Sequence, residues 1–458
     1  MSLELDVEVS AAGLDGDLNR TSSGQIRPGL SKWAASRPGP STREETFESI
    51  DAAVRMLKAN ASIVAGDLDL FENLAVHLSD GIHLTTEFSG MGGAEASLER
   101  VASAVQAQYE KGRVFGNISC MRASDKADHC QMVLKQHTGP AAPVCVFGDV
   151  TERMPVDMRR KLTASIAASR AHLWTAVARG KDKTKKVRKQ HVKEIGRRPF
   201  KTVVHVLKKE VDTSQHAETC MAYCQQHRDY CSTFKQPTAI PGGSTAIRFL
   251  VAGINCFDWS IRGSQDGWLG QSCLSYFEIM REVLTCQYDL VIFECVREFD
   301  ESGLEPFAEH YAIQSLTFSP TPLGLPCSRM RKYMMMALKA SFEWIPEVGS
   351  FGARAMFEAL FARSLQLYGH QLFAAPQAKI EEMRAQMVEA RGMPAKRRSG
   401  NVGRSFRRCL LASEPMCTGW TQWRRQTHIL AMQCFSHRPR GTRAHQRCPC
   451  AQQSCARP

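Results

Sequence analysis

Short apolar runs alternate along the chain with stretches in which apolar residues recur every three or four positions. The short runs predict buried strands, and the recurring spacing predicts amphipathic helices. Strands are predicted within Leu84–Gly93 and at Val114–Ser119, Pro143–Phe147, Lys201–Leu207, Ile247–Val251, Asp289–Val296 and Tyr333–Leu338. Helices are predicted within Glu44–Leu78 and at Ala94–Gln108, Val156–Val177, Met356–Gln366 and Lys379–Ala390. This alternation is typical of an α/β fold built on a mostly parallel sheet.

The two ends of the chain lack this pattern. The first segment is rich in Ser, Gly and Pro, and the last is rich in Arg, Cys and Gln without any period. Both are predicted to be disordered, because such compositions bury little apolar surface. The predicted organisation is a disordered segment at 1–44, a helical lead-in at 45–80, a central α/β domain at 81–345 with a basic, Cys-rich insertion at 152–244, helices at 346–400 and a basic tail at 401–458.

Composition narrows the class of protein. The chain has 458 residues, 43% of them hydrophobic, which is enough for a large core. It contains no run of 18 apolar residues, and its acidic first 20 residues lack the apolar stretch of a secretory signal. Seventeen cysteines fit a reducing compartment better than a disulfide framework. We therefore expect an intracellular protein with no membrane segment.

Positive charge is concentrated in two segments. The net charge is +13, yet Arg179–Lys209 and Arg391–Pro458 each carry more than ten Lys and Arg residues against one or two acids. Such segments can bind phosphate backbones by releasing counterions. The alternative is a flexible basic run exposed to solvent, and the sequence does not decide between the two.

A single thiol stands where catalytic groups of α/β proteins gather. Ile247–Val251 is an apolar strand that runs into the turn containing Cys256. Active sites of open α/β sheets lie at the carboxyl ends of strands, so Cys256 is a candidate nucleophile. The strand Asp289–Val296 ends near a carboxylate, Glu294. A buried Cys is more often an inert core residue, and Glu294 could simply cap a helix.

Five motifs occur in an order that resembles the C5-cytosine methyltransferase family. The family has F-x-G-x-G-G after its first strand, a strand-end G-D, P-C-x-x-x-S, E-N-V and G-x-P-Q-x-R-x-R. The matching residues are Phe88, Gly90, Gly92 and Gly93; Gly148 and Asp149; Cys256, Trp259 and Ser260; Glu294 and Val296; and Gly324, Pro326, Arg329 and Arg331. The resemblance covers residues 81–345 and implies a Rossmann-like, S-adenosylmethionine-dependent methyltransferase sheet with helices on both faces.

The resemblance implies catalytic roles for four residues. Cys256 matches the thiolate that adds to C6 of cytosine, and Glu294 matches the acid that holds N3 and the exocyclic amine. Arg329, beside Arg331, matches the guanidinium that steadies the base near O2. The base must leave the duplex stack to reach such a pocket. The implied partner is DNA, with RNA as the alternative, and the implied location is the nucleus.

The resemblance also implies a cofactor site. Phe88, Ser89 and the three glycines form the turn that S-adenosylmethionine would approach, and Gly90, Gly92 and Gly93 allow positive φ. Asp125 is a candidate for the ribose, and Asp149 for the adenine amine. The dinucleotide pattern G-x-G-x-x-G is absent, because Glu95 stands at its third glycine. For Asp149 the alternative is an ordinary helix N-cap.

The sequence departs from the family at three motif positions. Asn255 replaces the Pro before the nucleophile, Cys295 replaces the Asn after Glu294, and Cys327 replaces a Gln. The C-terminal N-x-V motif and a target-recognition domain are not evident. A catalytically inactive fold that binds cofactor or nucleic acid therefore stands as an alternative to a DNA or RNA methyltransferase.

Four soft ligands lie close together in the insertion. They are Cys220, Cys224, His227 and Cys231. Such a set could hold tetrahedral zinc. The spacing matches no common zinc module, and Tyr223 and Tyr230 also suit an ordinary amphipathic helix.

Overall fold

The computed structural model describes residues 37–65, 69–109, 118–179, 221–233, 246–344 and 353–367, with a few short pieces elsewhere, among them 435–437. Within these residues nine strands form one mixed sheet, in the order β5-β4-β3-β2-β1-β6-β7-β9-β8. The strands are β1 (Ile82–Glu87), β2 (Ile118–Ser124), β3 (Cys145–Phe147), β4 (Met221–Cys224), β5 (Asp229–Ser232), β6 (Ile247–Gly253), β7 (Leu290–Val296), β8 (Tyr311–Phe318) and β9 (Arg331–Leu338).

Strand direction divides the sheet into a parallel centre and two antiparallel margins. β3, β2, β1, β6 and β7 run parallel, whereas β9 runs antiparallel to both β7 and β8. On the other margin, β4 and β5 form an antiparallel hairpin that joins β3 through the pair Phe147 and Cys224. A separate two-stranded ribbon pairs β10 (Phe342–Trp344) with β11 (Phe435–His437).

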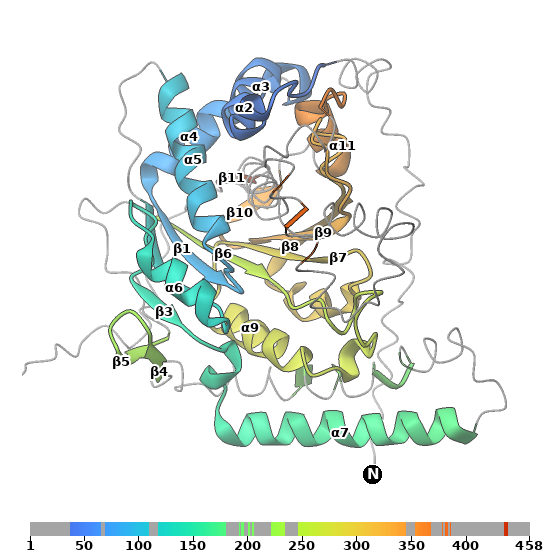
Figure 1. The fold of residues 1–458 in the computed structure, drawn as a ribbon. Helices are drawn as coiled ribbons and strands as arrows, with labels where there is room; N and C mark the ends of the chain where they lie inside the picture. The colour runs from blue at the N-terminus through green and yellow to red at the C-terminus, as the bar shows by residue number, and fades with distance from the viewer. Residues whose placement is uncertain are drawn as a thin grey trace, which may run out of the picture.

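Helices cover both faces of the sheet (Figure 1). They are α2 (Arg43–Phe47), α3 (Ser49–Ala65), α4 (Leu70–Asp80), α5 (Gly93–Gln108), α6 (Asp128–Gln136), α7 (Val156–Arg179), α9 (Cys273–Cys286) and α11 (Ala353–Phe361), with short 3-10 turns η2 (Val150–Arg153), η4 (Gly267–Leu269) and η5 (Glu301–Phe307). One core joins α3, α4, α5 and α11 to the sheet, and a second joins α7, α9, η2 and η5 to its other face. The predicted α/β class is confirmed.

Strand β6 shows why both faces are covered. Phe249 and Val251 belong to the core beneath α3–α5, whereas Leu250 and Ala252 belong to the core beneath α9. Alternate side chains of a strand point to opposite faces, so an unbroken apolar run requires a helical layer on each side. β1 lies between β2 and β6, where the strand order reverses. The carboxyl ends of β1 and β6 therefore flank the crevice in which open α/β sheets bind ligands.

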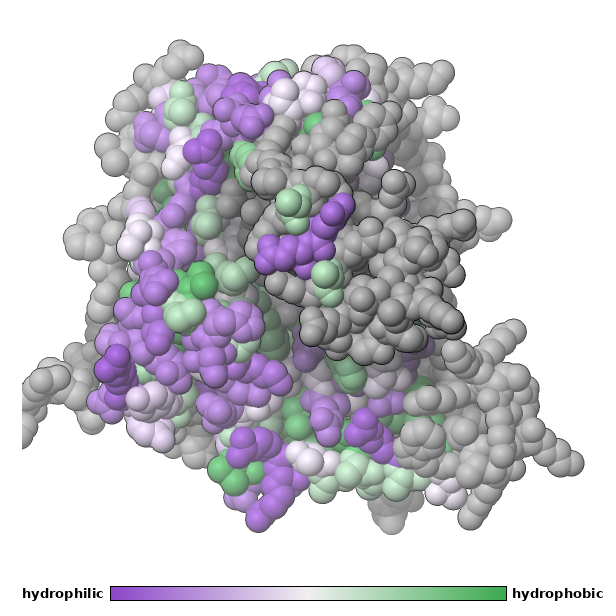
Figure 2. Space-filling model, viewed as in Figure 1, coloured by the Kyte–Doolittle hydropathy of each residue, from purple (hydrophilic) through white to green (hydrophobic). Residues whose placement is uncertain are grey.

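Many polar side chains of the covering helices lie at the surface. Figure 2 shows hydrophilic residues gathered over α2, α3 and α6, on the surfaces of these helices that point away from the sheet. Among the described residues, no helix combines the length and the apolar character that crossing a membrane requires.

Two sequence-based strand predictions differ from the structure. The run Lys201–Leu207 is not a strand, because its described residues, at 201 and at 204–205, are helical. The second strand, predicted at Val114–Ser119, begins at Ile118 and continues to Ser124, and 114–117 lie outside the described residues. A six-residue window of mixed polarity fixes neither the type nor the ends of an element.

The described residues begin at residue 37, before the predicted boundary at residue 45. Arg37 donates from its guanidinium to the carbonyls of Ala359 (2.7 Å) and Leu360 (3.0 Å) at the end of α11. A cation there satisfies carbonyls that the helix leaves without partners. The rest of 1–44, most of 368–400 and all of 401–458 except β11 lie outside the described residues.

Candidate functional site

The turn after β1 is held in a left-handed backbone conformation. Phe88, Gly90 and Gly92 have φ values of 53°, 58° and 80°. Gly93, which also allows positive φ, instead begins α5. A Cβ placed on Gly90 would meet no atom within 4 Å, so open space lies against the backbone there. The turn thus offers a ligand close approach to the main chain.

Asp125 follows β2 and holds this turn directly. One carboxylate oxygen accepts from the Gly90 amide (2.9 Å), and the other accepts from the Ala127 amide (2.9 Å). Ser89 is buried beside it, and its hydroxyl accepts from the Ser124 amide (3.1 Å) and contacts Thr86 (2.7 Å). Ser89 therefore ties the turn to β2, whereas Asp125 is half-buried at the open side.

Asp149 follows β3 and caps η2. Its Oδ1 accepts from the amide and the hydroxyl of Thr151, at 2.9 and 2.8 Å. The N-cap alternative describes its local role correctly. Both bonds use Oδ1, so the cap itself leaves Oδ2 to accept from a ligand.

These groups fit the adenosyl half of S-adenosylmethionine. Two carboxylates, Asp125 and Asp149, stand at the carboxyl ends of adjacent strands β2 and β3, and the Gly90 turn stands at the end of β1. Carboxylate oxygens suit ribose hydroxyls and an adenine amine, and the open turn suits a chain that must pass close to the backbone.

Cys256 lies in a hydrogen-bonded turn after β6. Its carbonyl accepts from the amides of Trp259 (3.0 Å) and Ser260 (2.7 Å). The Asn255 side chain accepts from the Phe257 amide (3.0 Å). Asn side chains fix turns in this way, so Asn255 supplies by hydrogen bonding part of the rigidity that a proline would supply covalently. Cys256 is half-buried against the core beneath α9.

Glu294 and two arginines meet on the neighbouring strands. Glu294 is paired in register with Gly253 of β6, and its carbonyl accepts from the Ile254 amide (2.9 Å). Its carboxylate forms an ion pair with Arg331 Nε at 2.9 Å. Burial lowers the pKa of the Arg329 guanidinium, Arg331 lowers it further, and Glu294 opposes both effects. The two arginines and the carboxylate therefore form one cluster.

Cys295 and Cys327 are the thiols beside this cluster, and Cys256 lies near Cys295. Cys295 donates weakly from Sγ to the Ile254 carbonyl (3.8 Å), and Cys256 is close enough to influence its pKa. Burial is the main cause that raises the pKa of Cys295 well above its ordinary value, and burial also raises the pKa of Cys327. A thiolate is hard to form at such positions. Of these thiols Cys295 is buried, whereas Cys256 is half-buried, and a nucleophile must be accessible to its substrate.

The loop after Cys256 depends on one buried carboxylate. Asp258 accepts from the Ser264 hydroxyl (2.5 Å) and from the Ser272 amide (2.8 Å) just before α9. Gly270 packs against it, and a Cβ on Gly270 would lie 1.8 Å from Asp258 Cγ. No side chain fits there without moving the loop.

We therefore expect Gly270→Ala to lower the free energy of unfolding by about 1–3 kcal/mol, the usual cost of an overpacked site. The midpoint of urea unfolding measures the effect. Gly148→Ala is a matched control, because its Cβ would lie 3.6 Å from the nearest atom, Glu152 Oε2, an ordinary contact. Equal midpoints for the two variants would contradict the close packing at Gly270.

The predicted soft ligands lie apart from this cluster, at the opposite margin of the parallel strands. Cys224, His227 and Cys231 belong to the β4–β5 hairpin, where they meet Cys145 of β3. Cys220 lies outside the described residues. Sequence reasoning missed Cys145, because no local spacing connects it to the hairpin.

Sequence reasoning also missed a buried ion cluster behind the Gly turn. Glu87, Arg122, Arg153 and Glu282 contact one another from β1, β2, η2 and α9. A charged residue at the end of an apolar strand was the only available indication, and it does not identify its partners.

Comparison with solved structures finds methyltransferases at low similarity. S. pombe Dnmt2 methyltransferase matches with 11% identity and a TM-score of 0.28, covering 59% of this chain and 54% of that one. A prophage-encoded E. coli protein named as a DNA modification methyltransferase matches with 11% identity and a TM-score of 0.27, covering 57% and 47%. A mutant of Spodoptera frugiperda DNMT2 matches with 11% identity and a TM-score of 0.24, covering 56% and 50%.

The chain thus spans about half the length of each of these structures. No family description and no curated protein matches the sequence. Similarity of this size does not by itself assign the chain to a family. All three structures are methyltransferases by name, the class of enzyme that the ordered motifs of the sequence resemble.

Proposed function

We propose that the protein transfers a methyl group from S-adenosylmethionine to C5 of cytosine in DNA, through a covalent adduct between Cys256 and C6. One observation carries the proposal. Strand β6, which leads to Cys256, pairs with β7, whose Glu294 forms an ion pair with Arg331, and with β1, which leads to the Gly90 turn. A nucleophile, an acid and a cation near a cofactor-binding turn are what this chemistry requires.

Each residue has a distinct role in the proposed reaction. Cytosine C5 is a weak nucleophile, so the Cys256 thiolate first adds to C6 and makes C5 electron-rich. Glu294 holds N3 and the exocyclic amine, and Arg329 steadies the base near O2. The ion pair with Arg331 holds the Glu294 carboxylate in one orientation. When bound, S-adenosylmethionine supplies an electrophilic methyl group. Loss of the C5 proton and elimination of the thiolate then release the product.

The two departures nearest Cys256 each make a replacement bond. Asn255 accepts from the Phe257 amide, and the Cys295 thiol donates to the Ile254 carbonyl. Both bonds fix the backbone that carries Cys256, which is the task of a rigid residue before a nucleophile. An S–H donor is weak, however, so this support is softer than an amide would give. The arrangement favours a slow enzyme over an inert fold.

Two alternatives belong to the same site. Methylation of cytosine in RNA uses the same residues, and the described residues show no element that separates the two substrates. A chain that binds cofactor or nucleic acid without turnover would result if Cys256 were mispositioned, because catalysis tolerates errors of little more than an ångström.

Transfer of labelled methyl groups tests the proposal. The full chain is incubated with labelled S-adenosylmethionine and with cytosine-containing duplex DNA or RNA of the same sequence. We expect label in DNA at C5, and none when Cys256→Ala is used. Label in RNA alone would favour the RNA alternative. Saturable cofactor binding without label in either polymer would reject the enzymatic proposal and leave the binding function.

A further inference from the structure

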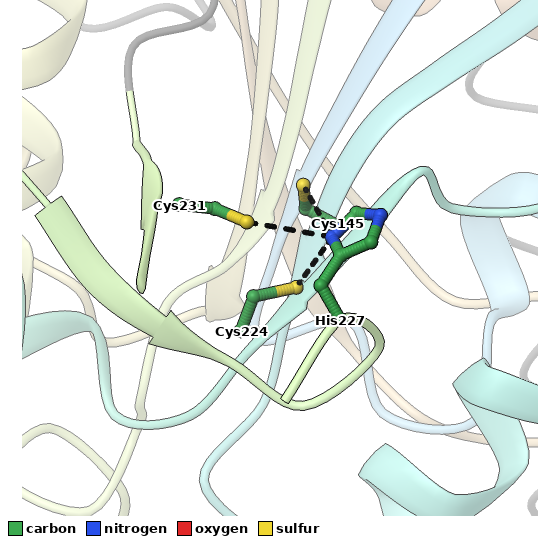
Figure 3. Close-up of side chains that lie close together, drawn as sticks. All are labelled: Cys145, Cys224, His227 and Cys231. Carbon is green, nitrogen blue, oxygen red and sulfur yellow. Dashed lines mark hydrogen bonds between the residues drawn. The ribbon is translucent and has the colours of Figure 1, made fainter. Parts of the chain in front are cut away.

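Four soft side chains converge on one point at the margin of the sheet. Cys145 comes from β3, Cys224 from β4, His227 from the turn after it and Cys231 from β5 (Figure 3). The sulfur atoms lie 3.7, 3.4 and 3.4 Å from His227 Nδ1, in that order. All four candidate ligand atoms lie within 4.8 Å of one another.

The backbone of the β4–β5 hairpin brings these side chains together. Arg228 has a φ of 55°, and its amide donates to the Cys224 carbonyl (2.8 Å), which closes the turn that carries His227. In the hairpin, Cys231 of β5 is paired with Ala222 of β4, the strand that also carries Cys224. The Gln225 amide donates to the Val146 carbonyl (2.7 Å) and fixes the hairpin against β3.

Hydrogen bonding alone does not account for this convergence. One imidazole nitrogen offers either a single lone pair or a single N–H, so it can satisfy one thiol and not three. The three cysteines are not joined in disulfides. Cys145 and Cys224 are buried, so the sulfurs surround the nitrogen largely out of solvent.

The distances match a tetrahedral metal site. Zinc binds thiolate sulfur at about 2.3 Å and imidazole nitrogen at about 2.0–2.1 Å. In a tetrahedron of those bonds, sulfur and nitrogen lie about 3.6 Å apart. The three observed distances, 3.4 to 3.7 Å, lie on either side of that value. Three thiolates and one imidazole form a donor set that zinc uses in structural sites.

We propose that Cys145, Cys224, His227 and Cys231 bind one structural zinc ion that fastens the β4–β5 hairpin to β3. The site is closed by four protein ligands, so it leaves no position for substrate. It also lies apart from Cys256, because β2 and β1 stand between β3 and β6. The sequence set is thereby revised, since Cys145 takes a ligand position for which Cys220 was predicted.

The zinc ion would stabilise a weakly attached element. Direct pairing between β3 and β4 is limited to Phe147 and Cys224. A metal that bridges the same two strands adds the cross-link that so short a ladder lacks. β3 also leads to Asp149, so the ion would steady the strand that ends at the proposed adenine contact.

Metal content of single-cysteine variants tests the site. The full chain is purified from zinc-supplemented cells, and zinc per chain is measured by mass spectrometry before and after dialysis. We expect Cys145→Ser, Cys224→Ser and Cys231→Ser each to lose one equivalent relative to the wild type. Cys130→Ser, which changes a described cysteine outside the cluster, and Cys220→Ser, which changes the ligand predicted from sequence, should keep the wild-type content.

X-ray absorption at the zinc edge gives a second measurement that does not depend on how the variants fold. We expect three sulfur neighbours at about 2.3 Å and one nitrogen at about 2.0–2.1 Å in the wild type. Chelation should expose the amides of Met221–Ser232 to hydrogen exchange. A wild type without tightly bound zinc, or loss of zinc in Cys220→Ser with retention in Cys145→Ser, would overturn the assignment.

Discussion

Cys256→Ser is expected to abolish covalent trapping by DNA that contains 5-fluorocytosine, while cofactor binding stays unchanged. Fluorine at C5 cannot leave as a proton does, so the wild-type adduct should persist and migrate as a protein–DNA complex under denaturing conditions. A hydroxyl is a far weaker nucleophile than a thiolate at neutral pH. We expect methyl transfer to fall by at least about 10³-fold, as is usual when a nucleophile is removed.

Cys295→Ser is the matched control for this experiment. Cys295 is the neighbouring buried thiol, and burial is the main cause of its raised pKa, so it should not form the adduct. Its variant should still trap DNA. Trapping that survives in Cys256→Ser, or disappears only in Cys295→Ser, would move the nucleophile away from the position proposed here.

The placement of Cys256 and Glu294 on neighbouring strands could be predicted because it depends on strand ends. Cys256 and Glu294 follow apolar runs that are recognisable in sequence, and the carboxyl ends of parallel neighbours meet at one edge of a sheet. The register that pairs Gly253 with Glu294 provides that meeting. The local sequence pattern and the sheet topology therefore predict the same location for these residues, although the roles of the residues stay predictions.

Backbone conformation could be predicted less well. Three glycines follow β1, and each of them allows positive φ. The structure places Phe88 in the left-handed region and begins α5 at Gly93. A glycine permits positive φ without requiring it, and the helix after the turn sets which positions use it.

Long-range pairs could not be predicted at all. Cys145 meets the β4–β5 hairpin only because β4 adds to the margin of the sheet beside β3. Cys220 lies close in sequence to the other three candidates and was therefore predicted instead. Spacing identifies ligands that share one turn or hairpin, whereas a ligand from a distant strand depends on the tertiary fold.

The buried ion cluster is the other long-range feature, and it supports both sides of the proposed cofactor site. Glu87 precedes the Gly turn, and Arg153 ends η2, whose cap is Asp149. Arg153 bonds both Glu87 (2.9 Å) and Glu282 (3.3 Å), and Arg122 also contacts both acids. The charges of these two cations and two anions therefore cancel inside the protein. Burial acts to raise the pKa of Glu87, but Arg153 and Arg122 outweigh it and lower that pKa.

Arg153→Met is expected to lower the free energy of unfolding at neutral pH by about 3–5 kcal/mol, because it leaves buried carboxylates short of a cation. Arg160→Met is the matched control, since Arg160 pairs with Asp157 on an exposed surface, and its loss should cost at most about 1 kcal/mol. Urea unfolding measures both variants.

The pH dependence separates lost charge from lost packing in Arg153→Met. The folded-state pKa of Glu87 is depressed, so its contribution to wild-type stability is present above its unfolded pKa of about 4.3 and is lost as the pH falls through the folded value. Arg153→Met has already lost most of that contribution. The difference in unfolding free energy between wild type and variant should therefore shrink as the pH falls below about 4. A difference that stays constant from neutral pH to pH 3 would mean that Arg153 acts through its packing. It would also mean that the contribution of Glu87 to stability does not depend on its charge.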